Sequence, residues 1–146
     1  MIALRTVLAP TDFSEPANRA LEYAKSIAEN FHATLHVLHV EENIAIGDPM
    51  LTASALADIH EVAESAPARI AAAFTPEERS RLNLVTAVVR GSPHDAILDY
   101  SKEHGIELIV LGTHGRGMVE KLLLGSVAER IVRHAPCPVL TVKAQN

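Results

Sequence analysis

The chain has 146 residues, of which 48% are hydrophobic and 21% are charged. These proportions are typical of one ordinary globular domain, so we expect a single domain over residues 1–146 and no coiled coil, collagen-like chain or disordered tail. The formal net charge is −5, whereas proteins that bind DNA or RNA usually carry a basic surface. We therefore expect no nucleic-acid partner, and any phosphate site must be local.

The chain contains one cysteine, Cys137. One cysteine can form neither a disulfide within the chain nor a thiolate metal cluster, and between Pro136 and Pro138 it is best interpreted as a small apolar residue. Residues 1–10 lack the apolar segment of a signal peptide, and no apolar run approaches the about 20 residues of a membrane span. We expect a cytoplasmic protein with no membrane partner.

The first third of the chain predicts a strand, a helix and a second strand. Residues 3–9 form a short apolar run that ends before a Pro-Thr-Asp sequence, which indicates a strand and its outgoing loop. Ser14, followed by Glu15 and Pro16, is typical of a helix start, and apolar residues then recur at spacings of three and four. Residues 33–40 alternate and predict a strand packed on both faces.

The middle of the chain is expected to contain a loop, a helix and a strand. Residues 41–50 show no period and include Gly, Asp and Pro, so we expect a loop and the most mobile segment. Residues 51–74 predict a helix that Pro67 should kink or interrupt. Residues 75–78 fit a capping box that could begin a short extra turn, and residues 84–90 predict the third strand.

The last third repeats the alternation. After residues 91–93, which resemble the earlier strand-to-helix sequence, we expect a helix that Gly105 closes, then the strongly apolar strand 106–111. A helix over about 127–134 and a strand over 139–142 complete the chain. Five strands alternating with helices predict an α/β fold, a doubly wound five-stranded parallel sheet with helices on both faces.

A glycine-rich loop follows the fourth predicted strand. Gly112, Gly115 and Gly117 lie close enough together for several backbone N–H groups to approach a ligand. Gly125 and Ser126 stand at the next helix start, where we expect Ser126 to be the N-cap and the following N–H groups to point at a phosphate. Any one glycine could simply shape a turn, but the whole spacing after a strand favours a phosphate site.

The loop is neither a Walker A motif nor a dinucleotide-binding Gly-x-Gly-x-x-Gly. It matches instead the spacing Gly-x2-Gly-x9-Gly-Ser/Thr and so resembles the universal stress protein family, in its ATP-binding class. The matching positions are Gly112, Gly115, Gly125 and Ser126. The resemblance extends to residues 9–12, 90–93 and 135–142, and so covers the whole chain.

This resemblance implies one ATP enclosed by the first loop, the end of the second strand and the glycine loop. The residues that would hold it are Pro10, Thr11, Asp12, His39, Val40, Gly112, His114, Gly115, Arg116, Gly125, Ser126 and Val127. Pro10 and Val40 could sandwich the adenine, while Asp12 could accept from its amino group or a ribose hydroxyl, or help to hold a metal-bound water. Asp12 could equally cap the following turn.

The charged residues around the loop leave two interpretations open. His114 could reach a phosphate or simply hydrogen-bond within the loop. Arg116, Lys121, Arg130 and Arg133 could neutralise a triphosphate or lie on a solvated helix face. Mg²⁺ is expected to accompany ATP, but the remaining histidines have no metal-ligand spacing, so no metal site of the protein's own is expected.

No set of catalytic residues stands out, so we expect a nucleotide-binding module for stress response or signalling, with an unidentified client protein. Alternatives are a weak ATPase, at most slow, and a structural partner protein that binds AMP or cyclic AMP. The family resemblance also implies a homodimer through residues 139–142, because the last strand of such a sheet commonly lies at its edge. Pro136 and Pro138 would limit the pairing, and a monomer is the alternative.

Overall fold

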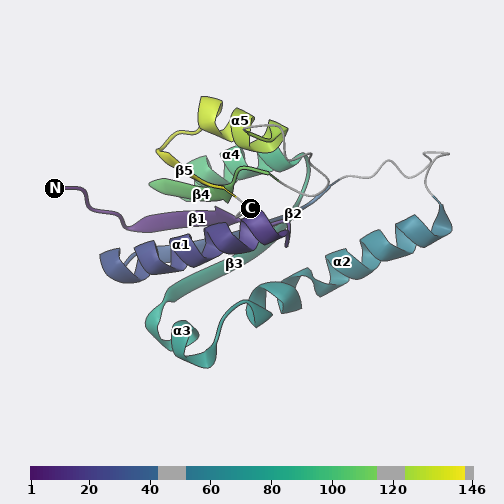
Figure 1. Ribbon diagram of the computed structural model, residues 1–146, viewed down its shortest axis with the longest axis horizontal. Coiled ribbons are helices and arrows are strands. Elements are labelled where there is room, and N and C mark those ends of the chain that lie inside the picture. Colours follow the sequence, from purple (N-terminus) through teal and green to yellow (C-terminus); the bar gives the residue numbers. More distant parts are fainter. Residues whose placement is uncertain (43–51, 115–123, 144–146) are drawn as a thin grey trace.

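The computed structural model describes residues 1–42, 52–114 and 124–143. Of the loop expected at residues 41–50, Glu41 is the last residue of the second strand and residues 43–50 lie outside these described residues. Gly115, Arg116, Gly117 and Lys121 also lie outside them. The strands are β1 (Thr6–Pro10), β2 (Thr34–Glu41), β3 (Asn83–Arg90), β4 (Leu108–Gly112) and β5 (Val139–Val142). The helices are α1 (Glu15–Phe31), α2 (Ala53–Ala72), α3 (Pro76–Arg81), α4 (Pro93–Glu103) and α5 (Ser126–His134) (Figure 1).

The five strands form one parallel sheet in the order β3-β2-β1-β4-β5. Parallel neighbours need crossover connections, and the helices between successive strands supply them. From β1 the chain adds β2 and β3 on one side of β1. It then adds β4 and β5 on the other side. The predicted fold class, a doubly wound five-stranded parallel sheet with helices on both faces, is confirmed.

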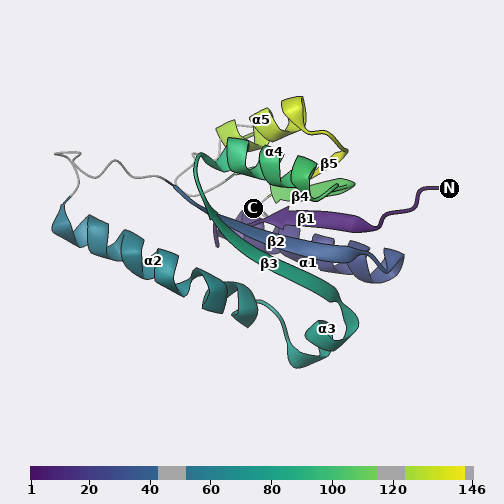
Figure 2. The same ribbon diagram turned by 180° about the vertical axis from the view of Figure 1, so that it is seen from behind.

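Two helical layers cover the sheet, as the opposite views in Figures 1 and 2 show. Residues of α1 and α2, such as Leu21 and Ile70, form one buried cluster with Val7 and Leu35 of the sheet. Residues of α4 and α5, such as Ile97 and Ile131, form the second cluster on the opposite face. The central strands are therefore buried on both sides, which explains their nearly continuous apolar sequences.

Helix α1 begins and lies where its sequence predicts. The Ser14 hydroxyl accepts a hydrogen bond from the N–H of Ala17, and Pro16 occupies the first turn. Alanines line the face that α1 turns to the sheet, and their short side chains let the helix lie close to it; these are Ala17, Ala20, Ala24 and Ala28. The helix ends at His32, whose φ of 53° is left-handed.

The region after β2 differs in part from expectation. Pro67 lies inside α2, which continues through it, so of the two predicted effects the interruption is wrong and the kink stays a prediction. The capping box before α3 is confirmed, because the N–H of Glu78 donates to Thr75 and the N–H of Thr75 donates to the Glu78 carboxylate. Lys25 of α1 donates to the carbonyl of Ala73 at 2.6 Å and pairs with Glu78, which fastens α1 to the end of α2.

Strand starts are the least accurate predictions. β1 begins at Thr6 rather than at residue 3, and β4 begins at Leu108 rather than at residue 106. Just before both strands, the N–H of Arg5 donates to the carboxylate of Glu107 at 2.6 Å. This contact adds to the backbone hydrogen bonds from Thr34 to Arg5 and from Glu107 to Thr6. In the described ranges, no helix combines the length and apolar character that crossing a membrane requires.

Candidate functional site

The strand order reverses between β1 and β4, and this reversal marks one position at the carboxyl edge of the sheet. β1 and β4 are neighbours, yet the chain leaves β1 for α1 on one face and leaves β4 for α5 on the other. The helices that follow β1 and β4 therefore lie on opposite faces of the sheet. In open α/β sheets, ligands bind at such a reversal, where no connection covers the strand ends.

The loop after β1 is held by backbone and side-chain hydrogen bonds. The N–H of Thr11 donates to the carbonyl of Leu38 at 2.8 Å, and the Thr11 hydroxyl accepts from the N–H of Phe13 at 3.0 Å. Asp12 Oδ1 accepts from the N–H of Ser14 at 2.9 Å, so the capping role left open by the sequence is present. A carboxylate has several acceptor sites, and this turn is compatible with a second contact to a ligand.

Phe13 holds the loop in a strained conformation. Its φ is 62°, a left-handed value that bulky residues rarely adopt, and such a residue costs about 1–3 kcal/mol. Its ring lies 4.7 Å from the His39 ring and 4.1 Å from the guanidinium carbon of Arg69. These contacts oppose the strain. Backbone strain of this kind clusters at binding sites, so the strain at Phe13 supports this loop as part of a candidate site.

His39 supports the loop from below. It is 8% exposed, and its Nδ1 lies 2.8 Å from the carbonyl oxygen of Thr11. Because a carbonyl can only accept, Nδ1 carries the proton and donates. His39 was predicted as a residue near the adenine. In the structure it fixes the backbone of Thr11, and is therefore a positioning residue for the loop.

Pro10 and Val40 lie on the same face of the sheet. Pro10 is paired with Leu38, and Val40 is two residues further along β2, so all three side chains point to the side of α4 and α5. Both Pro10 and Val40 are half-buried, and Val40 packs against the cluster on that side. They form apolar surfaces at the ends of neighbouring strands, and their contact with adenine stays a prediction.

Gly112 has a packing reason for being glycine. A Cβ added there would lie 2.8 Å from the carbonyl carbon and from the Cβ of Pro16. The absent side chain therefore lets the end of β4 touch the first turn of α1. The prediction that Gly112 approaches a phosphate is not tested by this contact, but part of the glycine pattern now has an explanation within the fold.

The start of α5 differs from the prediction. The N-cap is Gly125, and Ser126 is the first helical residue and makes no side-chain capping bond, so the expected N-cap role of Ser126 is wrong. The reason is that the Gly125 N–H donates to the carbonyl of Thr113 at 2.6 Å, which fixes the chain one residue earlier. Ser126 is exposed and Val127 half-buried, and the N–H groups of this first turn have no acceptor within the helix.

Thr113 is a central residue that the sequence analysis missed. It is 2% exposed, and its N–H donates to the carbonyl of Val142 at 3.0 Å. With its carbonyl bound to Gly125, it joins β4, β5 and the start of α5. Its hydroxyl lies 2.9 Å from Nδ1 of His114, so His114 bonds within the loop. The only signal in the sequence was a β-branched polar residue directly after a buried strand.

Two of the four candidate cations can be placed. Arg130 donates to Nε2 of His94 at 2.7 Å, and Arg133 pairs with Glu129 on the exposed side of α5 at 2.9 Å. Arg133 thus follows the solvated-face alternative. Among the residues that the structure describes, no three His, Cys, Asp or Glu side chains are grouped so that they could hold a metal ion.

Comparisons with known proteins agree on one family. The model of the Universal stress protein family matches residues 3–143. A universal stress protein of Methanocaldococcus jannaschii is 27% identical over 99% of this chain and 98% of its own length. One from Thermus aquaticus is 33% identical over 95% and 98%.

Solved structures give the same result. A universal stress protein from Lactobacillus plantarum superposes with a TM-score of 0.84 at 30% identity, covering 97% of this chain and 99% of that one. A universal stress protein in complex with cyclic AMP has a TM-score of 0.66 at 26% identity, covering 97% and 98%. The fold similarity thus spans nearly the whole of each chain.

Proposed function

Because this chain belongs to the universal stress protein family, we propose that it binds an adenine nucleotide, ATP with Mg²⁺, at the carboxyl edge of its sheet. Binding would serve a regulatory role in stress response or signalling, through an unidentified client protein. A cytoplasmic location is part of the same proposal.

The observation that carries the proposal is the convergence at the sheet reversal. The ends of β1, β2 and β4 and the first turn of α5 lie at the reversal, and we propose a nucleotide crevice between them. Each supplies a different kind of contact. The strand ends offer apolar surface and a carboxylate, and the helix start offers unsatisfied N–H groups and the positive end of a dipole. This combination suits a ligand with an apolar ring at one end and phosphates at the other.

Each described residue has a distinct proposed role. Pro10 and Val40 would contact the adenine, while the Thr11–Asp12 loop would hydrogen-bond the base or ribose. The N–H groups of Ser126 and Val127 would bind phosphate oxygens, with Gly125 and Gly112 allowing close approach. His114, Gly115 and Arg116 complete the proposed set. Since the described residues contain no metal cluster, phosphate oxygens and water would supply most of the Mg²⁺ ligands, helped by Asp12.

A cyclic nucleotide or AMP is the second candidate ligand. It is favoured by one specific observation, the similarity to a universal stress protein solved in complex with cyclic AMP. A weak ATPase is the third candidate. His39 and His94 are both engaged with other residues, which disfavours either of them as a base for water.

The test is to denature the purified protein, identify the released nucleotide by mass spectrometry, and then titrate ATP, AMP and cyclic AMP calorimetrically with Mg²⁺ or with a chelator. We expect ATP to be released and to bind most tightly with Mg²⁺. Tighter binding of cyclic AMP would select the second candidate. Absence of binding by all three ligands would refute the proposal. Hydrolysis counts only if a substitution at the site abolishes it.

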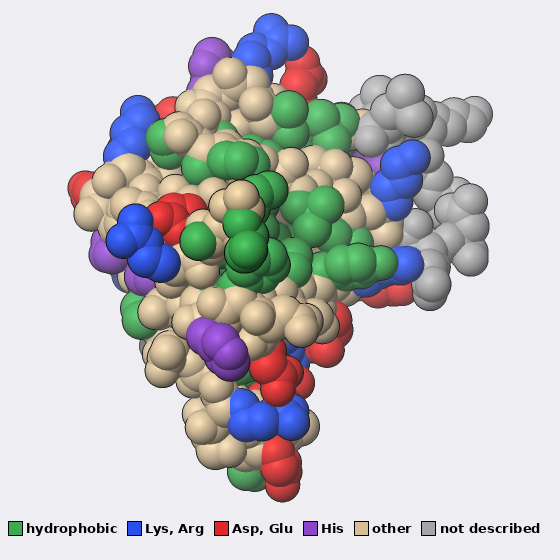
Figure 3. Space-filling view, turned by 90° about the vertical axis from the view of Figure 1, so that its left-hand side faces the viewer, with side chains coloured by type: hydrophobic (Ala, Val, Ile, Leu, Met, Phe, Trp, Pro, Cys, Tyr) green, Lys and Arg blue, Asp and Glu red, His purple; other side chains and the backbone are tan. Residues whose placement is uncertain are grey.

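We also propose a homodimer through β5. This strand lies at one edge of the sheet, and both α1 and α5 contact it. Leu140 of β5 is 36% exposed, and Tyr23 of α1 and Val132 of α5 are also exposed. Apolar side chains also gather on one face of the space-filling view (Figure 3). An unpaired edge with apolar neighbours favours pairing with a second copy.

A further inference from the structure

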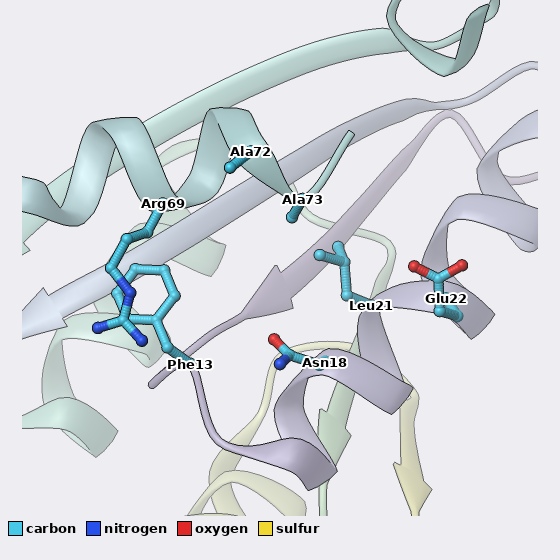
Figure 4. Close-up of a pocket in the computed structure, with 7 residues that line it drawn as sticks. All are labelled: Phe13, Asn18, Leu21, Glu22, Arg69, Ala72 and Ala73. Atoms are coloured by element: carbon cyan, nitrogen blue, oxygen red, sulfur yellow. The ribbon is translucent and has the colours of Figure 1, made fainter. Parts of the chain in front are cut away.

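A groove lies between α1 and α2, on the opposite face of the sheet from Pro10 and Val40 (Figure 4). Its volume is about 380 Å³, within the range of sites for small molecules. Its lining residues are Phe13, Asn18, Leu21, Glu22, Arg69, Ala72 and Ala73. The close-up shows Arg69 and Phe13 at one end, Glu22 at the other and Asn18 between them.

Arg69 is the chemically distinctive residue of this groove. Its guanidinium stacks on Phe13, with its carbon 4.1 Å from the ring centroid. Within the described part of the chain it has no carboxylate or carbonyl partner, although its side chain is half-buried. A guanidinium has five N–H donors in a planar fork that matches a carboxylate or a phosphate. Stacking on Phe13 holds this fork in place and leaves the donors for a ligand.

The other charged groups of the groove are already paired. Glu22 accepts from Nζ of Lys25 at 2.8 Å, and Lys25 also pairs with Glu78. The Glu22 carboxylate thus has a cation beside it and does not neutralise Arg69. Between the two ends, Leu21, Ala72 and Ala73 offer apolar surface. The groove therefore combines one unpaired cation with an apolar wall.

We infer that the groove between α1 and α2 binds a small organic anion, whose carboxylate or phosphate group is held by Arg69 and whose apolar part lies against Leu21 and Ala72. This site goes beyond the proposed nucleotide function. The groove lies on the side of α1 and α2, whereas Pro10 and Val40 face α4 and α5. The Asn18 carboxamide, on the α1 wall, would hydrogen-bond a polar atom in the middle of the ligand.

The first experiment is a nitrogen-15 NMR titration with three probes of similar shape: phenylacetate, phenyl phosphate and the neutral phenylacetamide. We expect the two anions to shift the Asn18 side-chain amide and the backbone amides of Ala72 and Ala73, and the neutral probe to bind at least about tenfold more weakly, which is about 1.4 kcal/mol. The stronger of the two anions shows whether the group is a carboxylate or a phosphate.

Variants assign the binding to Arg69. Arg69→Gln should weaken the better anion at least tenfold, whereas Arg81→Gln, which removes an exposed arginine on α3, should leave it unchanged. Asn18→Asp is a second variant at an exposed position and should also weaken the anion, because it adds a negative charge to the groove. Circular dichroism checks that each variant is folded.

Three outcomes would overturn the inference. The first is no shift with either anion up to about 10 mM, a concentration at which even weak sites are occupied. The second is binding that Arg69→Gln and Asn18→Asp both leave intact. The third is shifts confined to Ser126 and Val127, which would place the anion at the nucleotide crevice. In the wild type, ATP titration reads the crevice, and the shifts of Ala72 and Ala73 with the two anions read the groove, so failure of one site is distinguishable from failure of the other.

Discussion

Gly112 and Pro16 are in such close contact that any side chain at Gly112 would overlap α1, since an added Cβ would lie 2.8 Å from two atoms of Pro16. We expect Gly112→Ala to reduce the free energy of unfolding by about 1–3 kcal/mol, the usual cost of overpacking. Urea denaturation measures this loss. Because the displaced parts border the crevice, ATP affinity should fall as well.

Gly105→Ala is the matched control for that substitution. An added Cβ there meets nothing within 4 Å, but its φ of 58° is unfavourable for alanine. It should therefore lose stability by conformation alone, about 1–2 kcal/mol, and retain full ATP affinity, since it precedes β4 at the opposite edge of the sheet. Unchanged stability and affinity in Gly112→Ala would show that the contact with Pro16 relaxes freely.

The fold was predictable because local signals and the long-range arrangement agree. Apolar runs of strand length alternate with segments of helical period, and Ser14 and Thr75 both start helices as their types predict. The N-cap of α5 was not predictable, because Ser126 is the better capping residue by type. The contact between Gly125 and Thr113 decides the position instead, and it forms only after β4 and α5 have come together.

The site was predictable in position but not in its supports. Strand ends and glycine spacing indicated the crevice, since any parallel sheet brings those ends to one edge. Phe13 contacts His39 and Arg69, which belong to elements distant from it along the chain, and no local pattern marks these contacts. For the same reason Thr113 was missed, because its role depends on simultaneous contacts with β5 and α5.

His36 should make stability depend on pH. Nδ1 of this buried histidine lies 2.9 Å from the Tyr100 hydroxyl, and its ring lies 5.7 Å from the ring of His104. Burial, and secondarily His104, lowers the pKa of His36 below its ordinary 6.5. Below about pH 6.5 the unfolded chain therefore binds a proton at His36 more readily than the folded chain does. The free energy of unfolding consequently decreases as the pH is lowered, by at most about 1.4 kcal/mol per pH unit. The loss stops growing below the folded-state pKa.

Urea unfolding at several pH values between about 5 and 7.5 tests this dependence, because carboxylates contribute mainly at lower pH. His36→Gln, which cannot titrate, should show a shallower decline than the wild type. Tyr100→Phe loses the hydroxyl but keeps the titrating ring, so it should be less stable overall and retain the decline. Equal slopes in the wild type and His36→Gln would contradict the prediction.

Ser126→Asp should abolish most nucleotide binding. Ser126 is exposed in the first turn of α5, so a carboxylate there would face the proposed phosphates and cost on the order of 2–4 kcal/mol of binding. The fold should survive, because an acidic residue is favourable at a helix N-terminus. The neutral Ser126→Asn has a similar size and should bind much more tightly than Ser126→Asp. If calorimetry found wild-type ATP affinity in folded Ser126→Asp, the phosphates would not bind at the first turn of α5.

Leu140→Lys should convert the proposed dimer into a monomer without unfolding the chain. Leu140 is already 36% exposed, so a lysine there is hydrated in the monomer. In a dimer its charge would be buried without a partner, which we expect to cost about 3 kcal/mol or more.

The matched control is Val85→Lys, on the opposite edge strand β3, where the valine is 39% exposed. Light scattering should show a dimer for the wild type and for Val85→Lys, and a monomer for Leu140→Lys. A monomeric wild type would refute the dimer. Dissociation by Val85→Lys alone would show that the interface lies at β3, a longer strand that has no proline to limit its pairing.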